Sequence, residues 1–183
     1  MSQNTQTVGA SISLDGLKHA LKTIAPLIHR ISLVPVLQAV RMETIDGGIA
    51  FDATNLDTSI RVVLPELGGP DLPVLTPADK FRAYASLLTG TTVQITTDGA
   101  HAHLKCGRSK ATLPNLSPAN WPETATLFQL KGEGLTLTQG SFARALKFAL
   151  LAVGEGASRP AITGVKLESD GERLSVVTTT GVS

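Results

Sequence analysis

The sequence predicts an α+β protein in which a unit of helices and antiparallel strands is built once and then begun again. Three observations predict it. Apolar residues recur every three or four positions in several segments, as on one face of a helix. Short runs of alternating polarity end at turns such as Asp98-Gly99. The two ends of the chain also match when the sequence is shifted by 125 residues against itself, so that Ala20 aligns with Ala145.

Composition supports a folded protein and excludes several functional classes. The chain has 183 residues, of which 42% are hydrophobic and 17% charged, so it can bury a core. The formal net charge is +1, which excludes a polybasic protein. Aromatic residues make up only 4%, which argues against single-strand binding by base stacking.

The chain has the features of a cytoplasmic protein. Cys106 is its single cysteine, so no disulfide can form within the chain, as suits a reducing compartment. The polar N-terminus does not resemble a signal peptide, and residues 1–7 are expected to be a disordered tail. No apolar run reaches the roughly 18 residues of a membrane span, so no membrane role is expected.

The first copy of the repeat is complete and is expected to form a domain over residues 8–122. An apolar stripe from Leu14 to Ile28, bounded by Pro26, predicts its first helix. Strands are expected at 36–45, 49–54 and 58–64. Thr76 is expected to cap a second helix, with Pro77 as its first residue. Three further strands are expected between residues 93 and 113.

The second copy, residues 123–183, contains only the first half of the unit. Its helix stripe runs from Phe142 to Val153, and its strands are expected at 161–169 and 173–179. The copy stops at Ser183, before any counterpart of the second half. A half-unit leaves an apolar face and a sheet edge uncovered. We therefore expect a fragment of a longer protein, or a cover supplied by another chain.

Several sequence words resemble one known family. Arg159-Pro160-Ala161-Ile162-Thr163-Gly164-Val165 resembles the RPxLxGV segment of the bacterial sliding clamp, the beta subunit of DNA polymerase III. Ala53–Asp57 is similar to its A-T-D-L-E turn, and Thr76–Phe81 to its V-P-A-K-K-F helix start. Gly107–Lys110 is similar to its G-R-S stretch. The resemblance implies a DNA-clamp fold with helices on the inner face and sheets outside; this chain would hold domain I and the first half of domain II, without domain III.

The resemblance also implies a function. Clamps of this family are non-catalytic processivity factors that encircle double-stranded DNA as rings and tether the replicative polymerase. Sliding needs cations near phosphates without base readout. The expected DNA-facing residues are Lys18, Lys22, Arg30, Lys80, Arg82, Arg144 and Lys147. The loop that holds Arg30 is one residue longer than the family's, and Asp79 stands where the family usually has a basic residue.

Two further sites follow from the resemblance. The family binds a short peptide motif of the DNA polymerase III alpha subunit and of the clamp loader in a hydrophobic pocket. Its matching positions here are Ile162, Thr179 and Gly181. Ring closure by self-association uses apolar residues on the last strand of domain I, which fall on Ala111 and Leu113. No cofactor and no metal are implied.

Two alternatives stay open. The first alternative applies if the chain is complete: it is then a naturally short clamp-like interaction module, or a decoy for clamp-binding partners. The second alternative is a metal- or thiol-dependent enzyme whose active site is centred on His101, His103 and Cys106. It faces a geometric difficulty, because Cys106 has the opposite strand parity to the two histidines.

Overall fold

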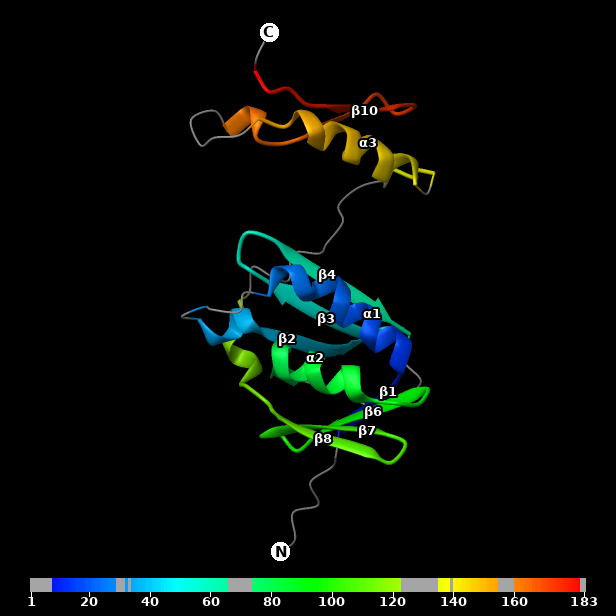
Figure 1. Ribbon diagram of the computed structural model, residues 1–183, viewed down its shortest axis with the longest axis vertical. Helices are drawn as coiled ribbons and strands as arrows, with labels where there is room; N and C mark the ends of the chain where they lie inside the picture. Colours follow the sequence, from blue (N-terminus) through cyan, green and yellow to red (C-terminus); the bar gives the residue numbers. More distant parts are fainter. Residues whose placement is uncertain are drawn as a thin grey trace, which may run out of the picture. The chain divides into compact units, whose positions relative to one another are not determined.

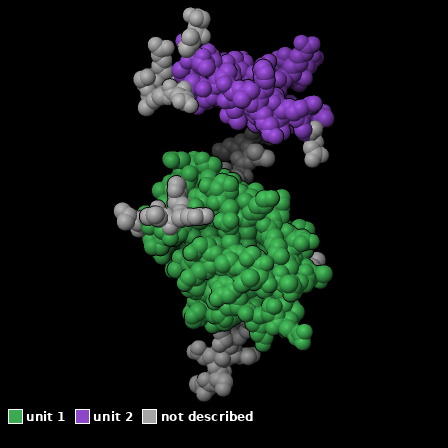
Figure 2. All heavy atoms as spheres, viewed as in Figure 1, with its two compact units in different colours: residues 1–129 green, residues 130–183 purple. Residues whose placement is uncertain are grey.

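The computed structural model describes residues 8–28, 32, 34–65, 74–122, 135–138, 140–154 and 160–181. The chain forms two compact units, residues 1–129 and residues 130–183, which are coloured separately in Figure 2.

Unit 1 consists of two successive half-units with the same order of elements: a strand, a helix and three strands. The first contains β1 (Val8–Ser13), α1 (Leu14–Ile24), β2 (Ala39–Ile45), β3 (Gly48–Thr54) and β4 (Ser59–Leu64). The second contains β5 (Val74–Pro77), α2 (Ala78–Leu87), β6 (Thr92–Thr97), β7 (His101–Cys106) and β8 (Ser109–Pro114).

The two half-units exchange their first strands. The sheets have the orders β1-β6-β7-β8 and β4-β3-β2-β5, with antiparallel pairing throughout. Ser13 at the end of β1 pairs with Thr92 at the start of β6, and Pro77 at the end of β5 pairs with Ala39 at the start of β2. Each half-unit therefore donates a strand to the other and receives one, which interlocks them.

Both helices pack against the sheets around one core. In Figure 1, α1 lies across β3 and β4, while α2 lies over β2. Leu17, Phe51, Phe81 and Ile95 are fully buried in this core. Ser13 caps the N-terminus of α1, because its Oγ accepts a hydrogen bond from the Gly16 N–H at 3.0 Å. Burial of each large apolar side chain contributes about 2 to 3 kcal/mol, so the core fixes how the helices present their outer faces.

In unit 1, three strands and one helix cap differ from the sequence prediction. β1 and β5 are not predicted, because β1 is rich in Gly, Ala and Ser and β5 has only four residues, so each becomes a strand through pairing with its partner strand. The prediction that Thr76 caps α2 is wrong: Thr76 lies within β5, and Pro77 occupies the cap position without a side-chain hydrogen bond. Residues 35–38 form a 3-10 turn, so β2 begins later than expected.

Within the described residues, unit 2 repeats part of the first half-unit, namely its helix and two of its strands. It contains α3 (Ser141–Ala149), β9 (Lys166–Ser169) and β10 (Leu174–Val177). The 3-10 turn at Ala25–Leu27 returns at Leu150–Ala152, which confirms the offset of 125 residues. The two units differ in how deeply their helices are buried. Leu17 and Leu21 are buried in unit 1, whereas their equivalents in unit 2, Phe142 and Leu146, are half-buried.

Candidate nucleic-acid interface

An open groove of about 850 Å³ lies between the two helices of unit 1. One side comes from α1 and the residues that follow it, and the other comes from α2. The lining residues are Lys18, Leu21, Lys22, Ala25, Ile28, Gln38, Asp79, Arg82, Ala83, Ala85 and Ser86. The groove is therefore formed by two helices that are far apart in the sequence.

The helical periodicity of α1 and α2 determines where the cationic side chains of the groove lie. On α1, Leu17 and Ile24 face the core, while Lys18 and Lys22 lie one turn apart on the outer side. On α2, Phe81 and Ala85 are buried and Arg82 is exposed. The helices thus use their apolar faces for packing and leave three cationic side chains around one opening.

The three cations are only lightly engaged. Lys18 Nζ donates to the carbonyl oxygen of Leu88 at 3.4 Å. Within the described part of the chain, Lys18, Lys22 and Arg82 take part in no ion pair. Asp79 in the first turn of α2 accepts from the Lys80 N–H at 2.7 Å and adds one negative charge to the groove. Positive charge therefore predominates among the lining residues.

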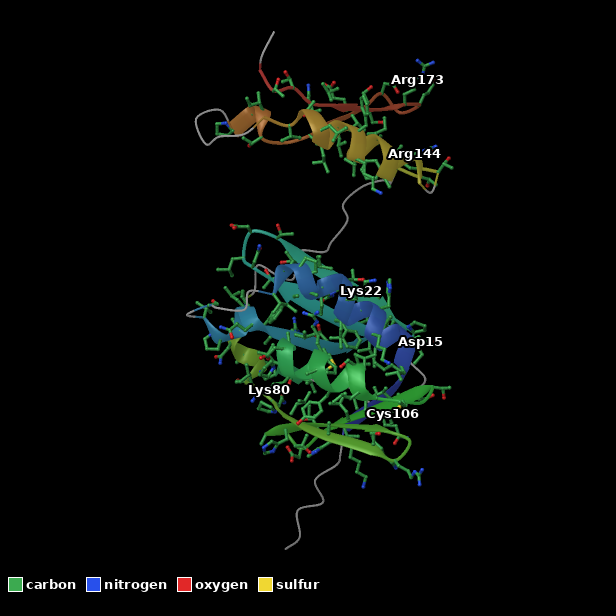
Figure 3. The ribbon with its side chains drawn as sticks, in the orientation of Figure 1. Asp15, Lys22, Lys80, Cys106, Arg144 and Arg173 are labelled. Atoms are coloured by element: carbon green, nitrogen blue, oxygen red, sulfur yellow. The ribbon has the colours of Figure 1, made fainter. Side chains whose placement is uncertain are left out.

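The other predicted DNA-facing residues lie elsewhere. Lys80 is exposed on α2 but does not line the groove, and Figure 3 labels it together with Lys22 of α1. Arg144 and Lys147 lie on α3 in unit 2 and do not belong to the groove. Arg30 lies outside the described residues. The structure therefore gathers Lys18, Lys22 and Arg82 from the predicted set.

The predicted ring contacts lie on β8, an edge strand of its sheet. Leu113 is only 1% exposed and belongs to the core of unit 1. Ala111 is half-buried and packs against the same core. Lys110 and Thr112 are the exposed side chains of this edge. A partner at this edge would therefore meet mainly the strand backbone and polar side chains.

The predicted peptide-pocket residues make two local contacts in unit 2. Ile162, in the 3-10 turn Pro160–Ile162, is half-buried against Gly154, whose N–H donates to the Ile162 carbonyl at 2.9 Å. A methyl group on Gly154 would approach Ile162 Cδ1 to 2.7 Å, so this close contact favours glycine. Thr179 and Gly181 form a turn in which Thr179 Oγ1 accepts from the Gly181 N–H at 3.0 Å.

The histidines and Cys106 lie on opposite faces of β7, which confirms the expected parity. Cys106 is buried, and its Sγ donates to the Thr89 carbonyl at 3.4 Å. His103 Nε2 lies 3.1 Å from Asp98 Oδ2, and His101 Nδ1 lies 3.6 Å from the same oxygen. Hydrogen bonds from the His101 N–H and from His103 lower the pKa of Asp98 to about 2. Among the described residues, no three His, Cys, Asp or Glu side chains are grouped to hold a metal ion.

An ion pair with a buried aspartate was not expected from the sequence. Arg61 on β4 donates from Nε to Asp52 Oδ1 and from Nη2 to Asp52 Oδ2, both at 2.7 Å. Asp52 is only 1% exposed, and its hydrogen bonds raise the pKa of Arg61. Glu43 joins this pair to Arg41 on the same sheet. Asp52 and Arg61 carry opposite charges and face each other on neighbouring strands, but the sequence shows this only once the register of the strands is known.

The fold is that of a sliding clamp. A sliding clamp (DNA polymerase III subunit beta) from Pseudomonas aeruginosa, bound to griselimycin, has a TM-score of 0.81 and 22% identity over 96% of this chain and 47% of its own. The beta subunit from the DNA polymerase of Streptococcus pyogenes has a TM-score of 0.78 and 22% identity over 94% of this chain and 47% of its own.

Sequence comparison shows the family. The family described as "DNA polymerase III beta subunit, N-terminal domain" matches residues 10–125, and the chain belongs to it. The beta sliding clamp of Streptomyces coelicolor is 26% identical over 145 residues, which are 79% of this chain and 38% of that protein. The Escherichia coli clamp is 25% identical over 170 residues, 90% of this chain and 46% of that protein. The chain thus spans less than half the length of these relatives.

None of the helices in the described residues is long and apolar enough to cross a lipid bilayer.

Proposed function

We propose that this chain acts as part of a DNA sliding clamp, a non-catalytic protein that surrounds double-stranded DNA in the cytoplasm and tethers the replicative polymerase. Residues 8–122 are proposed as clamp domain I, and residues 123–183 as the first half of domain II. The observation that carries the proposal is the groove between α1 and α2, with Lys18, Lys22 and Arg82 around it. Membership of the family supports it.

The chemistry of the groove suits sequence-independent contact with phosphates. Lysine and arginine neutralise phosphate oxygens, and this term carries no sequence information. Base recognition needs side chains fixed against base edges, whereas the groove's long cations are free of ion pairs within the described residues. The negative charge of Asp79 offsets one of the three positive charges of the groove. We therefore expect weak binding that salt suppresses.

Fluorescence anisotropy with two labelled duplexes of unrelated sequence tests the proposal. Lys22→Ala with Arg82→Ala should weaken binding to both duplexes by a similar factor. The matched control is Lys105→Ala with Lys110→Ala, because it removes the same charge from exposed positions of β7 and β8. Equal loss in the two double variants, or strong preference for one duplex, would contradict the proposal.

The remaining predicted partners form part of the same proposal. The peptide motif of the DNA polymerase III alpha subunit and of the clamp loader is proposed to bind beside Ile162, Thr179 and Gly181. Ring closure is proposed at the β8 edge near Ala111 and Leu113, where the exposed strand edge supports pairing with another chain. A labelled clamp-binding peptide tests the first point: Ile162→Ala should weaken its binding, and no change would contradict that assignment.

A further inference from the structure

A short segment of unit 1, Ser117–Trp121, lies against the rest of the unit through one side chain. The segment contains the 3-10 turn Pro118–Asn120 and is called the strap below. Trp121 is only 7% exposed, whereas the other four residues of the strap are exposed. Trp121 packs in a small apolar cluster that is separate from the main core and also contains Val36, Leu37, Ala39 and Leu75. The indole ring therefore holds the strap in place.

The residues just before the strap are held by several hydrogen bonds. The Asn115 N–H donates to the Ala100 carbonyl oxygen at 2.9 Å, and Asn115 Oδ1 accepts from the Leu75 N–H at 2.7 Å. The Leu116 N–H donates to the Leu75 carbonyl oxygen at 2.7 Å. Among the described residues, the strap itself makes hydrogen bonds only within its own 3-10 turn. The chain is therefore fixed to β5 as far as Leu116 and held by the indole ring beyond it.

The contact of the indole ring is imperfect. The Trp121 Nε1–H is buried and has no hydrogen-bond partner among the described residues. A buried donor without a partner raises the free energy of the closed arrangement, and most buried indole groups avoid this cost. Ordering the backbone of the strap costs conformational entropy as well. Both costs oppose the apolar contacts of the ring, so the closed strap is only weakly stable.

We propose that the strap opens and closes while the rest of unit 1 stays folded, with Trp121 as its latch. Opening lifts the indole ring out of the small apolar cluster and exposes Leu37 and Leu75, whose occupant is the strap itself. The inference does not depend on the proposed DNA binding. The strap contains no charged residue, so salt that suppresses DNA binding should leave its opening unchanged.

Opening of the strap changes the connection between the two units. The strap follows Leu116, which is fixed to β5, and precedes unit 2 in the sequence. Release of its five residues adds up to about 17 Å of extended chain to that connection. The strap is therefore a conformational device that lengthens the connection without unfolding the core of unit 1.

Hydrogen exchange of the indole N–H tests the strap in the unmodified chain. Trp121 is the only tryptophan, so its indole proton gives a single NMR signal. Its protection factor should be at least a hundredfold lower than that of the Ile95 amide on the central strand β6. Low urea concentrations should speed exchange of the Ile95 amide but not of the indole. Equal protection with the same urea dependence would overturn the proposal, because Trp121 would then be released only when unit 1 unfolds.

A thiol beneath the indole ring separates local opening from unfolding. Leu37→Cys introduces a thiol in the small apolar cluster, while the native Cys106 is buried in the main core and reports unfolding of unit 1. Adding Trp121→Ala should speed labelling of the introduced thiol at least tenfold and leave the labelling rate of Cys106 within about twofold. Equal acceleration of both thiols would overturn the proposal, because Trp121 would then stabilise unit 1 as a whole.

Replacement of Trp121 by 3-benzothienylalanine tests the unpaired N–H, because this residue keeps the size of the indole ring and carries sulfur in place of the N–H. Labelling of the thiol introduced by Leu37→Cys should slow at least about fivefold. Thr76→Val is the matched control: Thr76 Oγ1 is also buried without a partner among the described residues, but it points to the opposite face of β5 from Leu75. It should slow labelling of Cys106 alone. An unchanged or faster rate after replacement of Trp121 would overturn the weak latch.

Discussion

At the residue scale, Asp52 and Arg61 show how a charged pair becomes part of a buried sheet. Asp52 is buried, and Arg61 satisfies both of its carboxylate oxygens. Asp52→Asn should lower the free energy of unfolding by about 1 to 3 kcal/mol, because it removes the carboxylate charge and replaces one of the two acceptor oxygens by an amide donor, in a pair that is partly open to water. Urea denaturation measures this. Asp57→Asn, at an exposed turn, is the control, and equal effects would contradict the assigned role.

Asp98 gives a prediction for pH dependence. Its pKa is lowered to about 2 by the N–H of His101 and then by His103. A lowered carboxyl pKa adds stability above the unfolded-state value of about 4, and this contribution is lost as pH falls toward 2. In a carboxyl-detected NMR titration, His103→Leu should raise the Asp98 pKa but not to its ordinary value, because the backbone hydrogen bond remains. An unchanged pKa would exclude the contact.

At the element scale, the sequence predicted most helices and strands but missed the exchanged ones. The stripe from Leu14 to Ile24 and the alternation from Ala102 to Cys106 were enough to predict α1 and β7. β1 and β5 could not be predicted in this way, because they are strands only through β6 and β2 of the opposite half-unit. Their positions are a property of the tertiary structure rather than of local pattern.

The candidate site could likewise be predicted from the sequence only in part. Helical spacing indicated that Lys18, Lys22 and Arg82 lie off the apolar stripes, and they do. The sequence did not indicate that α1 and α2 form one groove, since this depends on how both helices pack on the interlocked sheets. The contact between Ile162 and Gly154 was likewise not indicated by the sequence, whereas the hydrogen bond between Thr179 and Gly181 belongs to a local turn.

Gly48 gives a prediction about strand pairing. A methyl group added to Gly48 on β3 would lie 2.2 Å from the Leu64 carbonyl oxygen on β4, where backbone must move. Gly48→Ala should therefore destabilise unit 1 by about 1 to 3 kcal/mol, as overpacked sites do. Thermal unfolding measures this. Gly164→Ala, where nothing lies within 4 Å, should be neutral, and a neutral Gly48→Ala would contradict the register of β3 and β4.

At the scale of the whole molecule, one half-unit explains both units. It occurs twice in unit 1, where exchange closes the core, and in part among the described residues of unit 2, where leucines at equivalent positions are exposed or half-buried. The outer sides of the helices carry cations in both units, at Lys22 and at its equivalent Lys147. The interlock therefore stabilises unit 1 and leaves the outer helix faces exposed, as the proposed contact with DNA requires.

The salt dependence of duplex binding tests the central claim, that the helix cations contact phosphates, most directly. The slope of log K against log salt falls by roughly 0.9 for each phosphate contact removed. Lys22→Ala with Arg82→Ala should therefore reduce the slope by about 1.8, and Lys105→Ala with Lys110→Ala should leave it unchanged. Identical slopes for the wild-type chain and the groove variant would contradict the account.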